Sequence, residues 1–135
     1  MTFIVWDDLY ETGIASIDEQ HKHLVSLLNR MLEALNQKKG GEEISYVIGE
    51  MAKYSEYHFS TEEELMLKAE YPDVGEHQIF HHAFTSKVVD YQHKLAARDD
   101  NLTAEVTIYL TNWLNDHLST IDQKYVPYMK KAGIT

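Results

Sequence analysis

The sequence predicts an all-α protein, an up-down-up-down antiparallel four-helix bundle with an irregular N-terminal arm over residues 1–15. Apolar residues recur at helical spacing through most of the chain, both prolines fall where such segments end, and short polar or glycine-containing stretches separate them. Four helices of about 20 residues joined by short loops must alternate in direction. We expect one domain over 1–135, with Trp6 and Ile14 of the arm packed across one end of the bundle.

The first two helices are delimited by a capping pattern, a glycine pair and a proline. The motif Ser16-x-x-Glu19 has the form of a capping box and predicts the start of a helix over about 16–38. Gly40-Gly41 ends that helix and precedes a second helix over about 42–69. The second helix stops because the residue before a proline disfavours helical geometry, which is the situation at Tyr71-Pro72.

The last two helices follow the same logic. Asp73-x-x-Glu76 is a second capping pattern and predicts a helix over about 76–97. The polar stretch 98–101 breaks it, and a fourth helix runs over about 103–124. Pro127 lies just beyond, where a proline cannot continue a helix.

The composition excludes several classes of protein. Cysteine is absent, so any metal must be held by nitrogen and oxygen donors, which favours iron, zinc or manganese over an iron–sulfur cluster. The net charge is -10, and the sequence contains no basic patch that would attract nucleic acid or an anionic membrane. No apolar run approaches the roughly 20 residues of a membrane helix, and Met1 to Tyr10 lacks the features of a signal peptide. We expect a cytoplasmic protein that binds neither nucleic acid nor membranes.

The inward face of each predicted helix is apolar at one end and carries histidine or glutamate at the other. One buried histidine is usually a hydrogen-bonded core residue, but polar side chains here interrupt the apolar faces of all four helices. In an up-down-up-down bundle, the start of the first and third helices and the end of the second and fourth share one end. The side chains that therefore converge there are His21, His58, Glu62, His77, His81 and His117.

Spacing within the helices supports a metal site. His58-x-x-x-Glu62 and His77-x-x-x-His81 are i, i+4 pairs, which lie on one helical face. The Glu-x-x-His motif of ferritin-like di-iron bundles is missing. Asp122 follows His117 by five residues, about 140° round an ideal helix, so periodicity alone predicts a solvated or capping acid. It can join the cluster only if the last turn is distorted, or if a metal lies between the two directions.

Four motifs carry a resemblance to a known family when they are taken together in this order. They are Trp6-Asp7 with Gly13 and Ile17-Asp18-Glu19-Gln20-His21; His58-Phe59-Ser60-Thr61-Glu62-Glu63; His77-x-x-x-His81; and Trp113-Leu114-x-x-His117-x-x-x-x-Asp122. This arrangement resembles hemerythrin, and more narrowly the single-domain bacterial hemerythrins. The resemblance covers nearly the whole chain, from the N-terminal arm to Tyr125.

The resemblance implies a di-iron site that binds dioxygen reversibly, for oxygen storage, delivery or buffering. Two non-heme iron ions per chain would share an oxo or hydroxo bridge. One iron would take His77, His81 and His117, and the other His21 and His58, which leaves it a vacant position for dioxygen. Glu62 and Asp122 would bridge the two ions. The sequence does not indicate which protein, if any, receives the oxygen.

An apolar wall around such a site would limit the entry of protons. We assign Leu24, Phe59 and Trp113 to this oxygen pocket, because each lies within about one helical turn of a candidate ligand; ordinary core packing is the alternative reading. Other polar residues near the site receive simpler interpretations. We expect three histidines to be solvated, namely His23, His82 and His93. We expect Glu63 and Glu64 to be surface acids beside Glu62. We expect Tyr125 and Tyr128 to close the open end of the bundle.

Three functions remain open at this stage. The first is an oxygen-binding protein that is not an enzyme. The second is a di-iron redox enzyme, a peroxidase or nitric-oxide-handling catalyst, although the inward faces offer no acid, base or nucleophile beyond the candidate ligands. The third is a sensor of oxygen or iron that acts through a partner, although no segment resembles an output domain. The same donors would also accept zinc or manganese.

Overall fold

Helices make up nearly all of the computed structural model, which describes residues 4–135. In chain order they are α1 (Ala15–Asn36), α2 (Gly40–Lys68), α3 (Val74–Ala96), α4 (Leu102–Trp113), the π-helix η1 (Leu114–Ile121) and α5 (Val126–Lys131). The described part contains no strand, which confirms the predicted all-α class. Residues 1–3, which began the predicted arm and the segment searched for a signal peptide, lie outside the described range.

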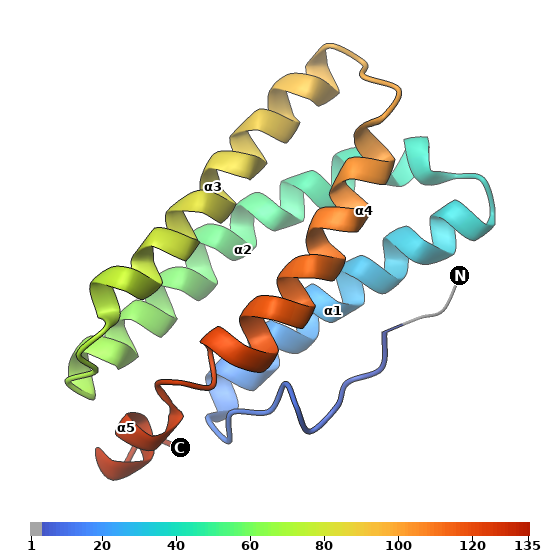
Figure 1. The fold of residues 1–135 in the computed structure, drawn as a ribbon. Helices are drawn as coiled ribbons and strands as arrows, with labels where there is room; N and C mark the ends of the chain where they lie inside the picture. The colour runs from blue at the N-terminus through green and yellow to red at the C-terminus, as the bar shows by residue number, and fades with distance from the viewer. Residues whose placement is uncertain (1–3) are drawn as a thin grey trace.

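The helices form an antiparallel bundle, as predicted. Successive helices α1, α2, α3 and α4 run in alternating directions, and η1 continues α4 toward the end where α1 begins (Figure 1). The start of α1, the end of α2 and the start of α3 lie at that same end, beside α5 (Figure 1). The bundle therefore brings together the helix ends that carry the histidines and carboxylates.

The helix starts differ from the predicted capping boxes. Helix α1 begins at Ala15 with Ile14 as its N-cap, so Ser16 lies inside the helix and caps nothing. Asp18 takes over this end: its carboxylate accepts hydrogen bonds from the Thr12 backbone N–H and hydroxyl and from the Gly13 N–H. At α3, Asp73 is the N-cap residue, but its side chain makes no capping hydrogen bond. The predicted capping boxes are therefore absent at both helix starts, and a different side chain, Asp18, holds the segment that leads into α1.

Gly40 begins a helix instead of ending one. Helix α2 starts at this residue, two positions earlier than predicted. A Cβ on Gly40 would lie 2.7 Å from Thr103 Cγ2 and 2.8 Å from Leu35 Cδ2, so the absence of a side chain lets three helices approach closely there. Around Gly41 the space is open. The two glycines thus differ in role, which sequence alone did not show.

The fourth predicted helix, 103–124, is helical only to Ile121 and changes type in its second half. Regular α-helix ends at Trp113, and the chain continues as π-helix over Leu114–Ile121. Pro127 does not simply lie beyond the last helix, because it occupies the first turn of α5, where a proline needs no N–H partner. This additional helix packs back over the end of the bundle (Figure 1).

Two apolar clusters lie on either side of the polar cluster. The larger runs through the middle of the bundle and includes Leu28, Met51 and Leu110, all without measurable exposure. The smaller closes the end, where Ile14 packs with Tyr125 and Met129. The two apolar clusters together exclude water from the polar residues that lie between them.

The arm packs differently from the prediction at one of its two residues. Ile14 lies across the end of the bundle as predicted. Trp6, in contrast, packs against the larger core cluster, with the Lys22 ammonium 5.3 Å from its ring centroid. Paired hydrogen bonds between Asn29 and the Ile4 backbone, both 2.7 Å, hold the arm along α1. Among the helices of residues 4–135, none combines the length and apolarity needed to cross a membrane.

Candidate metal centre

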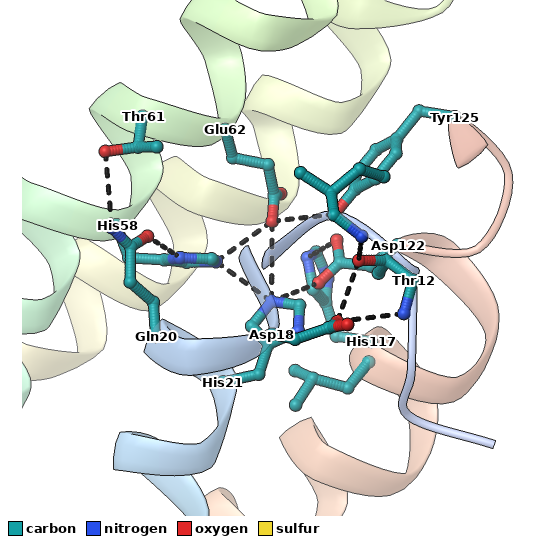
Figure 2. A network of polar contacts seen from close by, with 12 residues as sticks. Thr12, Asp18, Gln20, His21, His58, Thr61, Glu62, His117, Asp122 and Tyr125 are labelled. Atoms are coloured by element: carbon teal, nitrogen blue, oxygen red, sulfur yellow. Dashed lines mark hydrogen bonds and ion pairs between the residues drawn. The ribbon is translucent and has the colours of Figure 1, made fainter. Parts of the chain in front are cut away.

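The structure brings all seven predicted ligand side chains into one buried cluster. They come from α1, α2, α3 and η1, with Asp122 directly after η1, and each is at most 3 % exposed: His21, His58, Glu62, His77, His81, His117 and Asp122. Figure 2 shows Glu62 and Asp122 reaching into the cluster from different helical segments, with the rings of His21, His58 and His117 beside them. The predicted convergence is therefore present in the fold.

The cluster divides into two overlapping donor sets. One consists of three histidines and two carboxylates: His77, His81, His117, Glu62 and Asp122. The other consists of two histidines and the same two carboxylates: His21, His58, Glu62 and Asp122. Within each set the donor atoms lie within 4.8 Å of one another. Two ions could thus be held side by side, with both carboxylates in common.

Glu62 directs one carboxylate oxygen toward each histidine set. Its Oε1 lies 2.8 Å from His77 Nε2 and 3.0 Å from His81 Nε2. Its Oε2 lies 2.9 Å from His58 Nε2 and 3.5 Å from His21 Nε2. The carboxylate therefore spans the boundary between the two sets.

Asp122 repeats this arrangement from the other side. Its Oδ1 lies 2.9 Å from both His77 Nε2 and His117 Nε2, while its Oδ2 lies 3.1 Å from His21 Nε2. Each of the two buried carboxylates thus presents one oxygen to the three-histidine set and one to the two-histidine set.

The π-helix explains how Asp122 reaches the cluster. In a π-helix the backbone hydrogen bonds run from residue i to i+5, and the Asp122 N–H donates to the His117 carbonyl at 2.8 Å. The wider turn places residues five apart on nearly the same face, so Asp122 follows His117 into the interior. The interpretation of Asp122 as a solvated or capping acid, drawn from regular helix periodicity, is wrong: the residue has no measurable exposure.

The donor atoms fit a metal better than they fit one another. His117 Nε2 and both Asp122 oxygens are buried and make no hydrogen bond of acceptable geometry, although they lie within contact distance. Two donors at about 2.1 Å from one ion and at right angles to each other lie about 3 Å apart, which is the separation found throughout the cluster. Nitrogen and carboxylate donors suit iron, zinc and manganese. The residues present therefore fit two divalent or trivalent ions.

Electrostatics within the cluster favour charged carboxylates. Burial raises the pKa of Glu62, but the His58 charge and hydrogen bonds from His21, His58 and His77 outweigh it and lower that pKa well below its ordinary value. Burial and Glu62 likewise raise the pKa of Asp122, yet His117 and His21 lower it strongly. Both groups remain anionic at neutral pH, as metal ligands must.

The histidines respond in opposite directions. Burial lowers the pKa of His21 and of His77, but close contacts with the carboxylates of Asp122 and Glu62 overcome this and raise each pKa to about 9. For His58, burial dominates and lowers the pKa. Without metal, protons on His21 and His77 thus balance the two buried carboxylates, and a bound cation would take over that role.

A second layer of side chains orients the cluster, and sequence reasoning missed most of it. Gln20 Oε1 lies 2.5 Å from His58 Nδ1, and Glu63 Oε2 lies 3.1 Å from His81 Nδ1. Glu63 was interpreted as a surface acid, which is wrong, whereas its neighbour Glu64 is exposed as expected. The Tyr125 hydroxyl donates to Glu62 Oε2 at 3.1 Å (Figure 2). Helical spacing does not indicate Glu63, because a residue next to an inward position points about 100° away from it.

Aromatic rings cover three of the candidate ligands. Phe59 stacks on His81 with centroids 3.9 Å apart, and Trp113 stacks on His117 at 4.0 Å. Both rings are buried, as is Leu24, and their assignment to an oxygen pocket stays a prediction. Tyr54, which the sequence reading did not single out, stacks on His58 at 4.7 Å.

The remaining residues considered from sequence lie where they were expected. His23, His82 and His93 are exposed and take no part in the cluster. Tyr125 is buried at the end of the bundle, and Tyr128, 42 % exposed, packs there against Tyr71.

Comparison with known proteins agrees with this site. The family model described as Hemerythrin HHE cation binding domain matches residues 12–129. Among curated relatives, a bacteriohemerythrin of Pseudomonas aeruginosa is 36% identical over 132 residues, covering 98% of this chain and 85% of that protein. A bacteriohemerythrin of Stenotrophomonas maltophilia is 33% identical, covering 96% and 84%. A hemerythrin of Themiste dyscrita is 31% identical, covering 89% and 88%.

Solved structures show the same fold. A crystal structure of a hemerythrin mutant superimposes with a TM-score of 0.78, at 24% sequence identity, and covers 96% of this chain and 98% of its own. On the family model, the relatives above and the buried histidine–carboxylate cluster, this chain belongs to the hemerythrin family.

Proposed function

We propose that this protein binds dioxygen reversibly at a non-heme di-iron centre, for oxygen storage, delivery or buffering. One iron would be held by His77, His81 and His117, and the other by His21 and His58. Glu62 and Asp122 would bridge them together with an oxo or hydroxo group. When bound, the ferrous pair supplies the two electrons that dioxygen takes up on binding and returns on release.

The division of the carboxylate oxygens is the observation that carries the proposal. Glu62 and Asp122 each present one oxygen to the three-histidine set and one to the two-histidine set. A site for one ion would not require two carboxylates whose oxygens face different donor sets. A site for two ions would, because a bridging carboxylate binds both ions and fixes the distance between them.

The unequal histidine sets supply the place for a ligand. Five protein donors face one ion position and four face the other. With a shared solvent bridge, a six-coordinate first ion leaves the second with one position open, on the side of His21 and His58. An asymmetric pair of this kind favours ligand binding at one ion only.

Apolar side chains protect the site from water. Leu24 has no measurable exposure, Phe59 is 4 % exposed and Trp113 is 8 % exposed. A dry wall limits proton delivery, and protons are what convert bound, reduced oxygen into released peroxide. We therefore assign these residues to retention of the ligand in a form that can leave again as dioxygen.

Optical spectroscopy of the iron-loaded protein tests the proposal. The dithionite-reduced protein is expected to be colourless, to gain visible charge-transfer bands in air, and to lose them when oxygen is removed. Two irons per chain should be present by metal analysis. Direct and irreversible conversion to the ferric spectrum would contradict reversible binding and favour a redox enzyme. Steady turnover of peroxide or nitric oxide far above free iron would do the same.

A further inference from the structure

Two buried hydrogen-bond donors lie without acceptors beside the metal cluster. They are the Tyr54 hydroxyl and the Trp113 indole N–H. Tyr54 is 4 % exposed, and both polar atoms are fully enclosed. Buried donors are almost always paired in folded proteins, so an unpaired one needs an explanation, and two at one place need a common one.

The Tyr54 hydroxyl faces the interior next to the two-histidine set. Tyr54 precedes His58 by four residues, and the two rings stack with centroids 4.7 Å apart and planes at 16°. Tyr54 therefore lies one helical turn before a member of the two-histidine set, and its hydroxyl is buried there without a partner. Burial raises the pKa of the Tyr54 hydroxyl well above its ordinary value, and the carboxylates of Glu62 and Asp122 add to this rise, so the hydroxyl stays protonated and can donate.

Trp113 approaches the same place from the opposite helix. Its ring stacks on His117 with centroids 4.0 Å apart, one turn below that ligand. Tyr54 and Trp113 both pack against Phe84, with ring centroids 5.9 Å and 4.7 Å away, and neither polar atom has a hydrogen-bond partner. Phe59 also contacts both rings, and neither phenylalanine offers a hydrogen-bond acceptor.

We propose that the Tyr54 hydroxyl, with the Trp113 N–H beside it, donates a hydrogen bond to the small ligand bound at the open position on the His21–His58 side. The inference rests on the proposed function. Dioxygen would take up electrons from the ferrous pair, and azide is an anion before it binds, so both would accept a hydrogen bond from a neutral donor. A single hydrogen-bond donor in an apolar pocket favours small ligands that carry negative charge when bound. Ligands of equal size that cannot accept a hydrogen bond would bind less tightly.

Azide binding to the diferric protein tests this role with Tyr54→Phe. Loss of one hydrogen bond is expected to weaken azide about tenfold. The azide stretching frequency should shift between H₂O and D₂O in the wild type and should lose this shift in the variant. Dioxygen release from the reduced protein should accelerate by a similar factor. Tyr91→Phe is the matched control, because Tyr91 is equally buried but lies in the far part of the core.

The outcomes separate the two proposals. Wild-type protein that holds two irons but binds neither azide nor dioxygen would overturn the proposed function, and the role of Tyr54 with it. Wild-type binding that Tyr54→Phe leaves unchanged in affinity and isotope shift would overturn the role of Tyr54 alone. An effect of equal size in Tyr91→Phe would also contradict it, because the change would then reflect core packing.

Discussion

Asp122 follows His117 by five residues, and its Oδ1 lies 2.9 Å from His117 Nε2 because the backbone between them is π-helical. Segments with i→i+5 hydrogen bonds are rare and occur often at functional sites. Here the wide turn has a definite purpose, since it carries a carboxylate inward that a regular helix would direct elsewhere. One local irregularity thereby completes the set of two shared carboxylates.

Removal of this carboxylate should abolish the second ion. In Asp122→Ala we expect at most one iron per chain and no magnetic coupling between ions, because one of the two carboxylates common to both donor sets is removed. Metal analysis and Mössbauer spectroscopy measure both. Asp116→Ala is the control, since Asp116 is exposed in the same π-helix. Two coupled irons in Asp122→Ala would show that Asp122 is not a bridging ligand.

The metal-free protein should lose stability as the pH rises. His21 and His77 have pKa values of about 9 in the folded state, above the ordinary 6.5, so the folded state binds protons that the unfolded state releases. Their contribution is fully present below pH 6.5 and is lost as the pH rises through about 9. The rise of one histidine pKa from 6.5 to about 9 corresponds to about 3 kcal/mol. Because the two histidines share the same carboxylates, their effects do not add, and we expect the total loss of stability to be on the order of 3 kcal/mol.

Urea unfolding of the metal-free protein between pH 6 and pH 10 measures this dependence. The acid side behaves oppositely: the lowered pKa values of Glu62 and Asp122 preserve their contribution until strongly acidic pH. A free energy of unfolding that stays constant from pH 6.5 to 9.5 would contradict the prediction. The iron-loaded protein is the internal control, because bound metal replaces the protons.

Metal binding should release protons near neutral pH. A histidine must be neutral to bind a metal, and at pH 7.5 both His21 and His77 carry a proton in the metal-free protein. We expect these two histidines to release about two protons per chain on loading with two ferrous ions, in addition to any proton that a bridging water loses. Anaerobic calorimetry in two buffers of different ionisation enthalpy counts the total. The total should fall by about two above pH 9.5, and a count that does not depend on pH would argue against the assignment.

Glu63 should tune the metal through His81. Its carboxylate contacts His81 Nδ1 at 3.1 Å, and a carboxylate in this position orients a metal-binding histidine and raises its basicity. In Glu63→Gln we expect iron affinity to fall about tenfold, the lower end of such effects. Chelator competition measures it. Glu64→Gln is the matched control, because Glu64 is the exposed neighbour on the same helix, and equal affinities in both variants would exclude the role.

Gly40 and Gly41 offer a test of packing away from the site. Gly40→Ala should destabilise the protein by about 1 kcal/mol, because the new Cβ meets Thr103 and Leu35 at under 3 Å. Gly41→Ala meets nothing within 4 Å and should be neutral or slightly stabilising. Urea unfolding compares them. Equal effects of the two substitutions would show that the helix junction is less tightly packed than described.

Helical periodicity was sufficient to predict much of the fold and of the cluster. The spacing of His21, His58, Glu62 and His77 along apolar faces required their convergence once the helices alternated in direction. These residues needed no detail of side-chain packing, because any regular antiparallel bundle with these helices would bring them together. Their convergence in the structure confirms that reasoning, while their role as ligands remains a prediction.

Other features depended on contacts that periodicity does not encode. Asp122 required a π-helix, whose start at Leu114 follows no known residue pattern in this chain. The helix α5 was missed because Pro127 indicates a helix stop as readily as a first turn. Glu63 and Tyr54 lie beside inward positions, and only the actual side-chain directions show that one contacts His81 and the other stacks on His58.

The sharing of Glu62 and Asp122 has a consequence for biosynthesis. A ribosome completes the helix that carries Glu62 long before it reaches Asp122, near the end of the chain. A nascent chain that has released α1 to α3 holds five of the seven candidate donors but only one carboxylate. Such an intermediate can trap a single ion but cannot pair two. Binding of two ions is therefore a late event in synthesis, and it can occur only after η1 has packed against the other helices.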